Sequence, residues 1–318
     1  MSGKQHDGLL LLPPHRFPDL DDETQLADDF NLRLYVAESQ QDLAESVPEA
    51  KVIMMTPYGE LDAETVKRAE RCIAIVRYGV GVDNIDIDAA ARQGIPVANV
   101  PAAATEEVAI SAVTMGLALL RRLPQADAAL RAGSWTGALM SGVPRISGLT
   151  VGVVGLGRIG ALVARYWEAF GVRVITHELS ERETPWPNVS FDEIVDTADL
   201  ISLHVPRTPE TANMLSRARI ARLKRRAVVV NVARGGLVDE DALAEALTEG
   251  RVGGAALDTF AVEPPDPHHP IFAAPNTLLT GHLSWRSDQS VRDYQRLAIA
   301  AAREALSGKR MHTIVNGL

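Results

Sequence analysis

TVGVVGLGRIG, residues 150–160, is the stretch that decides the fold of this 318-residue chain. A run of valines leads directly into three glycines, and the helix-compatible run ALVARYWEAF follows. This order predicts a strand, a tight turn and a helix. Gly155 allows the turn, Gly157 lets backbone N–H groups approach a pyrophosphate, and Gly160 lets the helix pack closely on the strand. Because a helix N-terminus also carries partial positive charge, the stretch predicts a dinucleotide-binding site.

An acidic residue stands where such a site needs one. Glu178 ends the next predicted strand, VRVITHE, 18 residues beyond Gly160. Its carboxylate can bind both ribose hydroxyls of an adenosine and repels a 2′-phosphate, so NAD is favoured over NADP. Each feature alone has a plainer interpretation, an ordinary glycine turn for the first and a solvated strand-end glutamate for the second.

Composition excludes several classes of protein. The net charge of -9 and the short Lys/Arg runs offer no basic surface for nucleic acid. The apolar run LLLLPP near the N-terminus is too short to span a bilayer and is typical of a buried strand. The single cysteine, Cys72, lies in an apolar run and fits a buried side chain in a reducing compartment. We therefore expect a cytoplasmic protein without nucleic-acid or membrane partners.

Short apolar runs alternate with helical patterns in two blocks of the chain. Residues 8–100 form the first block, and the second begins at the glycine stretch. This alternation predicts an α/β fold with two parallel sheets covered by helices. Between the blocks we expect a long, mostly buried helix from Ala102 to Arg122 and then a loop over residues 124–148. The last expected element is a helix from Ser287 to Leu306.

Candidate catalytic residues lie at predicted strand ends of the second block, where ligands of parallel sheets bind. Arg234 has a planar fork suited to a carboxylate, and His282 is the histidine placed to deliver a proton at neutral pH. Glu263 could hydrogen-bond that imidazole and raise its pKa. The plainer alternatives are a surface arginine for Arg234, a capped strand end for His282 and an ordinary loop glutamate for Glu263. No metal is expected, because His268 and His269 lack further ligands at a suitable spacing.

Seven motifs, in order, make the chain resemble the D-isomer-specific 2-hydroxyacid dehydrogenase family over nearly its whole length. They are RYGVGVDNID, NVPAAATEEVA, VGVVGLGRIG, LHVPRTPET, NVARGGLVDEDAL, AALDTFAVEPP and NTLLTGH. The resemblance implies an NAD-dependent oxidoreductase that transfers a hydride between nicotinamide and a small 2-oxo or D-2-hydroxy acid. It also implies two doubly wound domains with the active site in the cleft between them. A central Rossmann NAD domain, residues 101–284, would be inserted in a flavodoxin-like substrate domain, residues 1–100 and 285–318.

The resemblance also implies a role for each matching residue. Arg234 would bind and polarise the 2-oxo acid, and His282 with Glu263 would be the acid/base pair. Substrate contacts are implied for Arg77, Tyr78, Val80, Gly81 and Trp285. Cofactor contacts are implied for Thr105, Gly155, Gly157, Arg158, Ile159, Gly160, Glu178, His204, Val205, Pro206, Thr211, Asn231, Val232, Ala233, Asp258 and His282. Family members form homodimers through the NAD domain, so the Ala102–Arg122 helix and the Trp135 loop are the expected dimer surface.

Within the family, the chain is most similar to the C-terminal-binding-protein branch, because Trp285 follows His282 by three residues. Glyoxylate and hydroxypyruvate reductases also carry a tryptophan at this position. Two functional alternatives stay open at this point. One is an NAD(H)-responsive interaction protein, and the other is an oxidoreductase for a different small anion such as phosphite.

The chain departs from the family pattern at four positions. Gly281 replaces the usual proline before the histidine, which loosens the backbone there. Ile110 and Ser111 stand where many relatives have Glu and His, so a common polar contact is expected to be missing. Thr259 replaces a valine. These departures make it unsafe to transfer a known substrate preference to this chain.

Overall fold

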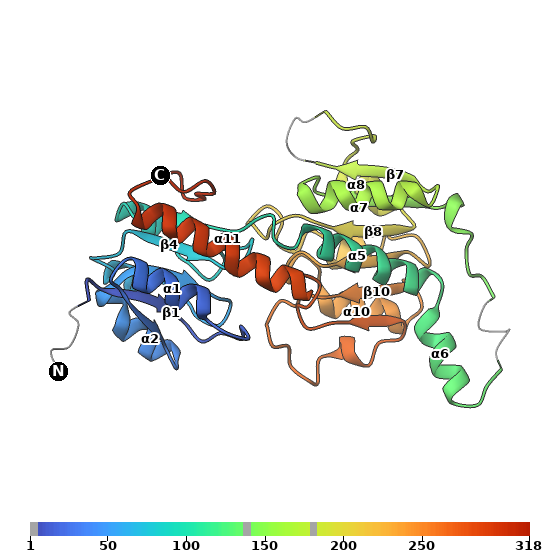
Figure 1. Cartoon of the computed structure of the whole chain (residues 1–318). Coiled ribbons are helices and arrows are strands. Elements are labelled where there is room, and N and C mark those ends of the chain that lie inside the picture. Colours follow the sequence, from blue (N-terminus) through green and yellow to red (C-terminus); the bar gives the residue numbers. More distant parts are fainter. Residues whose placement is uncertain (1–5, 136–140, 179–182) are drawn as a thin grey trace. The chain divides into compact units, whose positions relative to one another are not determined.

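The computed structural model describes residues 6–135, 141–178 and 183–318. The chain divides into two compact units, which we call unit 1 (Met1–Ala104 and Arg286–Leu318) and unit 2 (Thr105–Trp285). Each unit contains one parallel β-sheet with helices packed on both faces (Figure 1). The predicted fold class, two parallel-sheet α/β domains, is confirmed.

Unit 1 has a five-stranded sheet in the order β2-β1-β3-β4-β5. Its strands are β1 (Leu9–Leu12), β2 (Arg33–Val36), β3 (Ala50–Met55), β4 (Ala74–Arg77) and β5 (Val97–Ala98). Its helices are α1 (Asp21–Asp29), α2 (Gln40–Ser46), α3 (Ala63–Lys67), α4 (Ile87–Arg92) and α11 (Asp288–Leu306). Helices α2, α3 and α4 pack on the face that includes Leu9 and Leu11, while α1 and α11 lie side by side on the other face (Figure 1). Because both faces are covered, the four leucines of β1 are all buried.

The chain after α11 adds to the edge of this sheet. Ile314 forms an antiparallel bridge with Ala98, and the Val315 N–H donates to the carbonyl of Val97 (2.8 Å). The Asn316 side chain accepts the Val97 N–H (3.0 Å). The last element that the sequence predicts is the helix ending at Leu306, so this segment was not expected. A short stretch without apolar periodicity carries no local sign that it will cover a strand edge.

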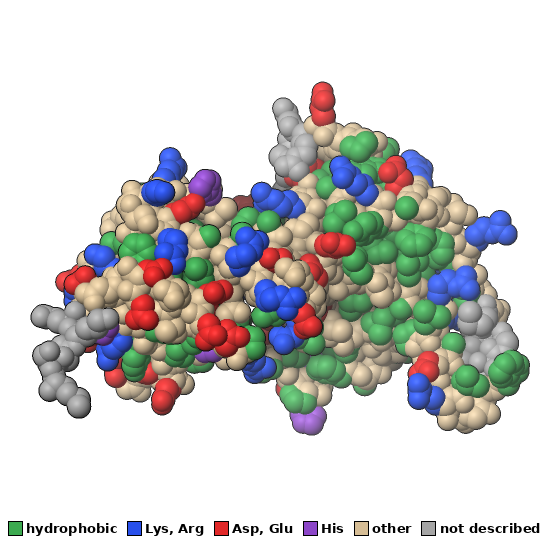
Figure 2. Space-filling view, viewed as in Figure 1, with side chains coloured by type: hydrophobic (Ala, Val, Ile, Leu, Met, Phe, Trp, Pro, Cys, Tyr) green, Lys and Arg blue, Asp and Glu red, His purple; other side chains and the backbone are tan. Residues whose placement is uncertain are grey.

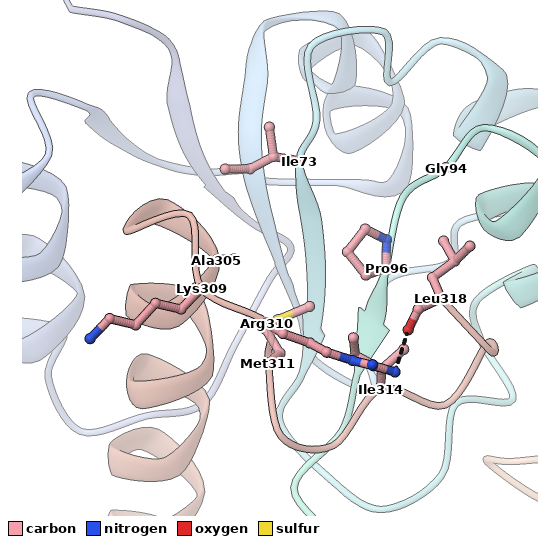
Figure 3. Close-up of a pocket in the computed structure, with 9 residues that line it drawn as sticks. All are labelled: Ile73, Gly94, Pro96, Ala305, Lys309, Arg310, Met311, Ile314 and Leu318. Atoms are coloured by element: carbon pink, nitrogen blue, oxygen red, sulfur yellow. Dashed lines mark hydrogen bonds between the residues drawn. The ribbon is translucent and has the colours of Figure 1, made fainter.

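A hollow of ≈ 370 Å³ lies between this segment, the end of α11 and the residues that precede β4 and β5. Figure 3 shows Arg310 reaching across it to donate to the carbonyl of Leu318 (3.2 Å). Ile73 and Pro96, which also line it, come directly before their strands, so the hollow lies at the amino ends of β4 and β5. Ligands of parallel sheets bind at the opposite, carboxyl ends.

Unit 2 has a six-stranded parallel sheet in the order β11-β10-β9-β8-β6-β7. Its strands are β6 (Thr150–Val154), β7 (Arg173–His177), β8 (Leu200–Leu203), β9 (Val228–Asn231), β10 (Gly254–Leu257) and β11 (Thr277–Leu279). Its helices are α5 (Thr105–Leu120), α6 (Leu123–Arg131), α7 (Arg158–Ala169), α8 (Phe191–Thr197), α9 (Arg217–Ile220) and α10 (Glu240–Thr248). In β9, Val229 packs with α8, α9 and α10, whereas Val228 and Val230 pack with α5 and α7. The strand order reverses at β6, so the carboxyl end of TVGVV lies at the switch point of the sheet.

The loop predicted over residues 124–148 is wrong in its first part, because α6 spans Leu123–Arg131. Arg122, with a left-handed φ of 52°, separates α6 from α5, and Pro124 stands in the first turn of α6. None of the α6 residues is buried. The helix therefore lacks the buried apolar stripe by which a helix is recognised in a sequence.

Cys72 is buried just before β4, as its apolar surroundings predict. Burial raises the pKa of its thiol to about 12, which leaves it protonated and unreactive at neutral pH.

Within the described ranges, no helix is long and apolar enough to cross a membrane.

Candidate functional site

The glycine turn after β6 is shaped to receive an anion. Gly155 has a φ of 88°, and a Cβ on Gly160 would lie 1.9 Å from the Gly155 carbonyl oxygen, so a side chain does not fit there. Gly157 precedes α7 and makes no side-chain cap, and the space beside its Cα is open. The first N–H groups of α7 need an acceptor from outside the helix. A pyrophosphate fits this requirement.

Glu178 follows β7 and lies over the glycine turn. The N–H of Leu156, inside the turn, donates to its Oε2 (2.8 Å). The backbone of Glu178 is fixed in turn by the side chain of Asn188, which accepts its N–H (2.9 Å). A carboxylate is therefore held at the end of the strand next to the glycine turn, in the position that ribose recognition requires.

His204 follows β8 and packs against the glycine turn. A Cβ placed on Gly160 would lie 3.3 Å from the Cβ of His204. The Nε2 of His204 is 2.7 Å from Ser202 Oγ. Burial lowers the pKa of His204 to about 3, so its imidazole is neutral in the folded protein near neutral pH. Thr211 closes the same loop, because its Oγ1 donates to the Pro206 carbonyl (2.7 Å).

Arg234 lies in the turn after β9, which the side chain of Asn231 organises. Asn231 Nδ2 donates to the Arg234 carbonyl (2.7 Å), and Asn231 Oδ1 accepts the Ala233 N–H (3.1 Å). The next residue, Gly235, touches the loop after β10, since a Cβ there would lie 1.8 Å from the Phe260 carbonyl oxygen. The arginine turn and the loop that carries Glu263 are thus in direct contact.

Glu263 and His282 form a hydrogen-bonded pair. His282 Nδ1 and Glu263 Oε2 are 2.8 Å apart, and the Phe260 N–H donates to the other carboxylate oxygen (3.0 Å). Burial alone would raise the pKa of Glu263. The hydrogen bonds from His282 and Phe260, with the positive charges of His282 and Arg234, outweigh burial and lower it. The carboxylate is therefore ionised at neutral pH and can stabilise a protonated imidazole.

Asp258 holds the loop that presents His282. Its backbone carbonyl accepts the His282 N–H (2.7 Å), and its carboxylate accepts the N–H groups of Leu283 (2.8 Å) and Ser284 (3.1 Å). The Thr280 hydroxyl donates to the same carboxylate (2.6 Å). Asp258, for which the resemblance implies a place beside nicotinamide, thus also fixes the backbone on both sides of His282.

Besides Gly281, which lies in this loop, two departures from the family pattern lie near it. Ser111 in α5 donates to the carbonyl of Ser284 (3.2 Å), so this position still makes a polar contact with the loop. Thr259 Oγ1 is buried and has no hydrogen-bond partner among the described residues. Nothing in the structure explains why a threonine stands there.

Unit 1 places Arg77 at the end of β4, followed by a loop that includes Val80 and Gly81. Arg77 Nε donates to Asn84 Oδ1 (3.2 Å), and the guanidinium also donates to the Tyr78 carbonyl. The side chain of Val80 is exposed. The guanidinium and the loop backbone therefore lie together at the carboxyl end of the strand.

Tyr78 points into unit 1. It is almost fully buried, and its hydroxyl donates to Oε1 of the buried Glu23 in α1 (2.7 Å). Gln295 in α11 approaches the same carboxylate (3.4 Å). Burial, together with the charge of Glu23, raises the pKa of the Tyr78 phenol. The sequence assigns Tyr78 to the substrate, whereas its hydroxyl links β4 to two helices.

The structure brings together most of the residues that the sequence singles out in unit 2, at the carboxyl ends of successive strands. Most of the remaining cofactor candidates follow the same pattern: Arg158 and Ile159 begin α7, Val205 and Pro206 follow β8, and Val232 follows β9. Thr105 is the exception, because it begins α5, which no strand of unit 2 precedes. Trp285 is partly buried against the α5 and α7 core. Sequence reasoning missed two residues that hold neighbouring loops. Glu240, the first residue of α10, accepts the Ala261 N–H (2.7 Å), and Asn84 donates to the carbonyls of Thr56 and Gly59. No spacing rule predicts these side-chain contacts. Among the described residues, no three His, Cys, Asp or Glu side chains could together hold a metal ion.

A family model described as D-isomer specific 2-hydroxyacid dehydrogenase, NAD binding domain, matches residues 113–284. D-3-phosphoglycerate dehydrogenase of Mycobacterium bovis is 38% identical over 297 residues, which cover 92% of this chain and 56% of that protein. Glyoxylate reductase of Thermofilum pendens is 35% identical over 291 residues, which cover 87% of this chain and 85% of that protein. The chain thus spans about half the length of the phosphoglycerate dehydrogenases that it matches.

Solved structures agree with these matches. The crystal structure of D-lactate dehydrogenase from Aquifex aeolicus, complexed with NAD and lactic acid, has a TM-score of 0.86 at 27% identity. The match covers 94% of this chain and 96% of that one. The sequence, family and structural matches together confirm the resemblance that the seven motifs indicate.

Proposed function

Since the chain belongs to the D-isomer-specific 2-hydroxyacid dehydrogenase family, we propose that it is an NAD-dependent oxidoreductase. It transfers a hydride between nicotinamide and a small 2-oxo or D-2-hydroxy acid. The observation that carries the proposal is the hydrogen-bonded His282–Glu263 pair (2.8 Å). The positive charge of Arg234 also helps to lower the pKa of the Glu263 carboxyl. A proton donor and a cation for an oxyanion are the groups that ketone reduction needs beside its hydride donor.

The three residues divide the chemistry among them. Arg234 binds the acid and polarises the 2-oxo group, because its planar guanidinium matches two oxygens at once. His282 keeps Nδ1 toward Glu263, so Nε2 is the nitrogen that gives its proton to the new alkoxide. Glu263 stabilises the protonated imidazole before transfer. Bound NADH supplies the hydride.

The proposal assigns substrate contacts to Arg77, to the backbone N–H groups of Val80 and Gly81, and to Trp285. Tyr78 contributes through the position of its backbone, since its hydroxyl is engaged by Glu23. We assign residues 101–284 to the NAD domain and residues 1–100 and 285–318 to the substrate domain. The single buried thiol, Cys72, fits a cytoplasmic protein.

Loss of the proton donor tests the reaction. We expect His282→Gln to lower kcat/KM for NADH-dependent reduction of 2-oxo acids at least about 100-fold, because general acid catalysis typically contributes that much or more. His268→Gln, at an exposed histidine of the same unit, serves as the control and should match the wild type. A His282 variant with wild-type turnover, or no turnover of any 2-oxo acid by the wild type, contradicts the proposal.

Cofactor preference follows from Glu178, and we propose NAD rather than NADP. Its carboxylate lies over the glycine turn, where a 2′-phosphate would meet a like charge. The wild type should therefore use NADH at least about 100-fold better than NADPH, and Glu178→Gln should narrow this ratio. Comparison of kcat/KM for the two cofactors is the measurement. Equal use of both by the wild type contradicts the assignment.

We also propose a homodimer formed through unit 2. Figure 2 shows hydrophobic side chains gathered over α5 and α7, where Leu117, Leu162 and Tyr166 are only partly buried. Beyond α5, none of the α6 residues is buried, and Trp135 is 92% exposed. Apolar surface of this kind is typical of a subunit contact.

A further inference from the structure

Three loops of unit 1 form one connected cluster at the carboxyl ends of β1, β3 and β4. Thr56, just after β3, donates its hydroxyl to the carbonyl of Pro14 in the loop after β1 (2.7 Å). Asn84, beyond β4, donates to the carbonyls of Thr56 (2.9 Å) and Gly59 (2.6 Å). Side-chain hydrogen bonds thus hold the three loops together.

This cluster carries two arginines on different loops. Arg77 is held by Asn84, as described above. The guanidinium of Arg16 stacks on the ring of Tyr58, 4.9 Å from its centroid, and the Tyr58 N–H donates to Thr56 Oγ1 (3.2 Å). A chain of contacts through Tyr58, Thr56 and Asn84 therefore connects the two arginines.

A direct contact also joins the Arg16 loop to the residue after Arg77. Phe17, next to Arg16, lies 4.8 Å from the ring of Tyr78, which is next to Arg77. His15, which precedes Arg16 in the chain, stacks on Phe17 with the ring centroids 5.5 Å apart. The Arg16 loop thus contacts the residue after β4 through Phe17 and the loop after β3 through Arg16.

From this cluster we infer that the substrate carries a second anionic group beyond its 2-oxo acid end, and that Arg16 binds it. The inference rests on the proposed function, since it names the class of acid on which that site acts. Arg16 is exposed, and a stacked guanidinium keeps the N–H groups along its edge directed outward for a carboxylate or phosphate. Tyr58 holds the fork in place, so little side-chain entropy is lost on binding.

The position of Arg16 in the sheet separates it from an ordinary surface arginine. Arg33 stacks on Tyr35 in the same way (5.5 Å), but it is the first residue of β2 and lies at the amino end of the sheet. Ligands of parallel sheets bind at the carboxyl ends. Tyr58 and Val80, exposed apolar residues of the cluster, can contact the carbon atoms between the two anionic groups. Arg33 therefore supplies a matched control.

The test compares acids that differ only in the distal group. 2-Oxoglutarate is paired with 2-oxopentanoate, which has a methyl in place of the second carboxylate, and 3-phosphohydroxypyruvate is paired with hydroxypyruvate. Steady-state kcat/KM with NADH is measured for the wild type, Arg16→Gln and Arg33→Gln. For at least one pair, the wild-type kcat/KM should be about tenfold or more higher for the acid with the second anionic group, as expected for a charge-assisted hydrogen bond. The preferred pair tells whether the group is a carboxylate or a phosphate.

Arg16→Gln should reduce this preference to about twofold or less and leave kcat/KM for the monoanionic acid nearly unchanged. Arg33→Gln should keep the full preference. No preference in the wild type, or the same preference in Arg16→Gln, overturns the inference while leaving the proposed reaction intact.

A binding measurement decides the case in which no acid is turned over, which would contradict the proposed function itself. The same four acids are titrated calorimetrically into the NADH-loaded wild type and Arg16→Gln. Binding of a dianionic acid that weakens about tenfold in Arg16→Gln supports the anion site without any turnover. Absence of binding, or binding equal in both proteins, overturns it.

Discussion

At the scale of single residues, His282 has an unusual backbone conformation. Its φ of 57° lies in the left-handed region, which costs a residue other than glycine about 1 kcal/mol or more. Asp258 offsets this cost by binding the backbone at His282, Leu283 and Ser284. The sequence leads us to expect a loosened backbone at Gly281, and the structure shows that the left-handed residue is His282, directly after it. The strained residue is thus the one to which the proposed function gives proton transfer.

His204 makes the stability of the fold depend on pH. Its folded pKa of about 3 lies below the ordinary value of 6.5, so between these values the unfolded chain binds more protons. His204 therefore has no effect above about pH 6.5 and costs stability as the pH falls, by up to about 1.4 kcal/mol per pH unit. Relative to His204→Gln, the wild type should lose urea resistance between about pH 6.5 and pH 5. Parallel pH curves for the two proteins would contradict this expectation.

At the scale of elements, the first residue of α10 connects two loops of the candidate site. Glu240 Oε1 accepts the Ala261 N–H (2.7 Å), so α10, which follows the Arg234 turn, fixes the loop that leads to Glu263. Burial raises the pKa of Glu240, and the Ala261 hydrogen bond and the charge of His269 offset part of this effect. Together with the contact between Gly235 and Phe260, this bond sets the spacing between the two catalytic loops.

Glu240→Ala should therefore lower kcat by about 10-fold to 100-fold, because small displacements of reacting groups cost rates of this order. The KM for NADH should stay within about twofold. Glu240→Gln keeps an acceptor and should recover most of the activity. Asp241→Asn, at the exposed neighbour that pairs with His269, is the control. Equal falls in kcat for the alanine and glutamine variants would contradict a positioning role, as would a change confined to KM for NADH.

At the scale of the whole molecule, we expect the exposed apolar surface of unit 2 to form the dimer contact. Leu130 and Trp135 are exposed apolar residues on and just after a helix that buries none of its own residues. We expect Leu130→Asp with Trp135→Ser to shift light scattering from dimer to monomer, since a charge in an apolar contact is costly. Leu318→Ser, at an exposed apolar residue of unit 1, should leave the mass unchanged. A wild-type monomer, or a double variant that stays dimeric, contradicts the proposed surface.

The sequence by itself determined the glycine turn, the two parallel-sheet domains and the family, because these rest on short local motifs and on the order in which such motifs and apolar runs follow one another. It also identified Arg234, Glu263 and His282 as candidates, since strand ends can be located from apolar runs. Only the tertiary structure showed the Asp258 contacts to the His282 loop, the burial of Tyr78 against Glu23 and the Glu240 bond to Ala261. The same is true of the segment that pairs with β5. These features depend on hydrogen bonds and packing between residues far apart in the chain, and local periodicity carries no record of such contacts.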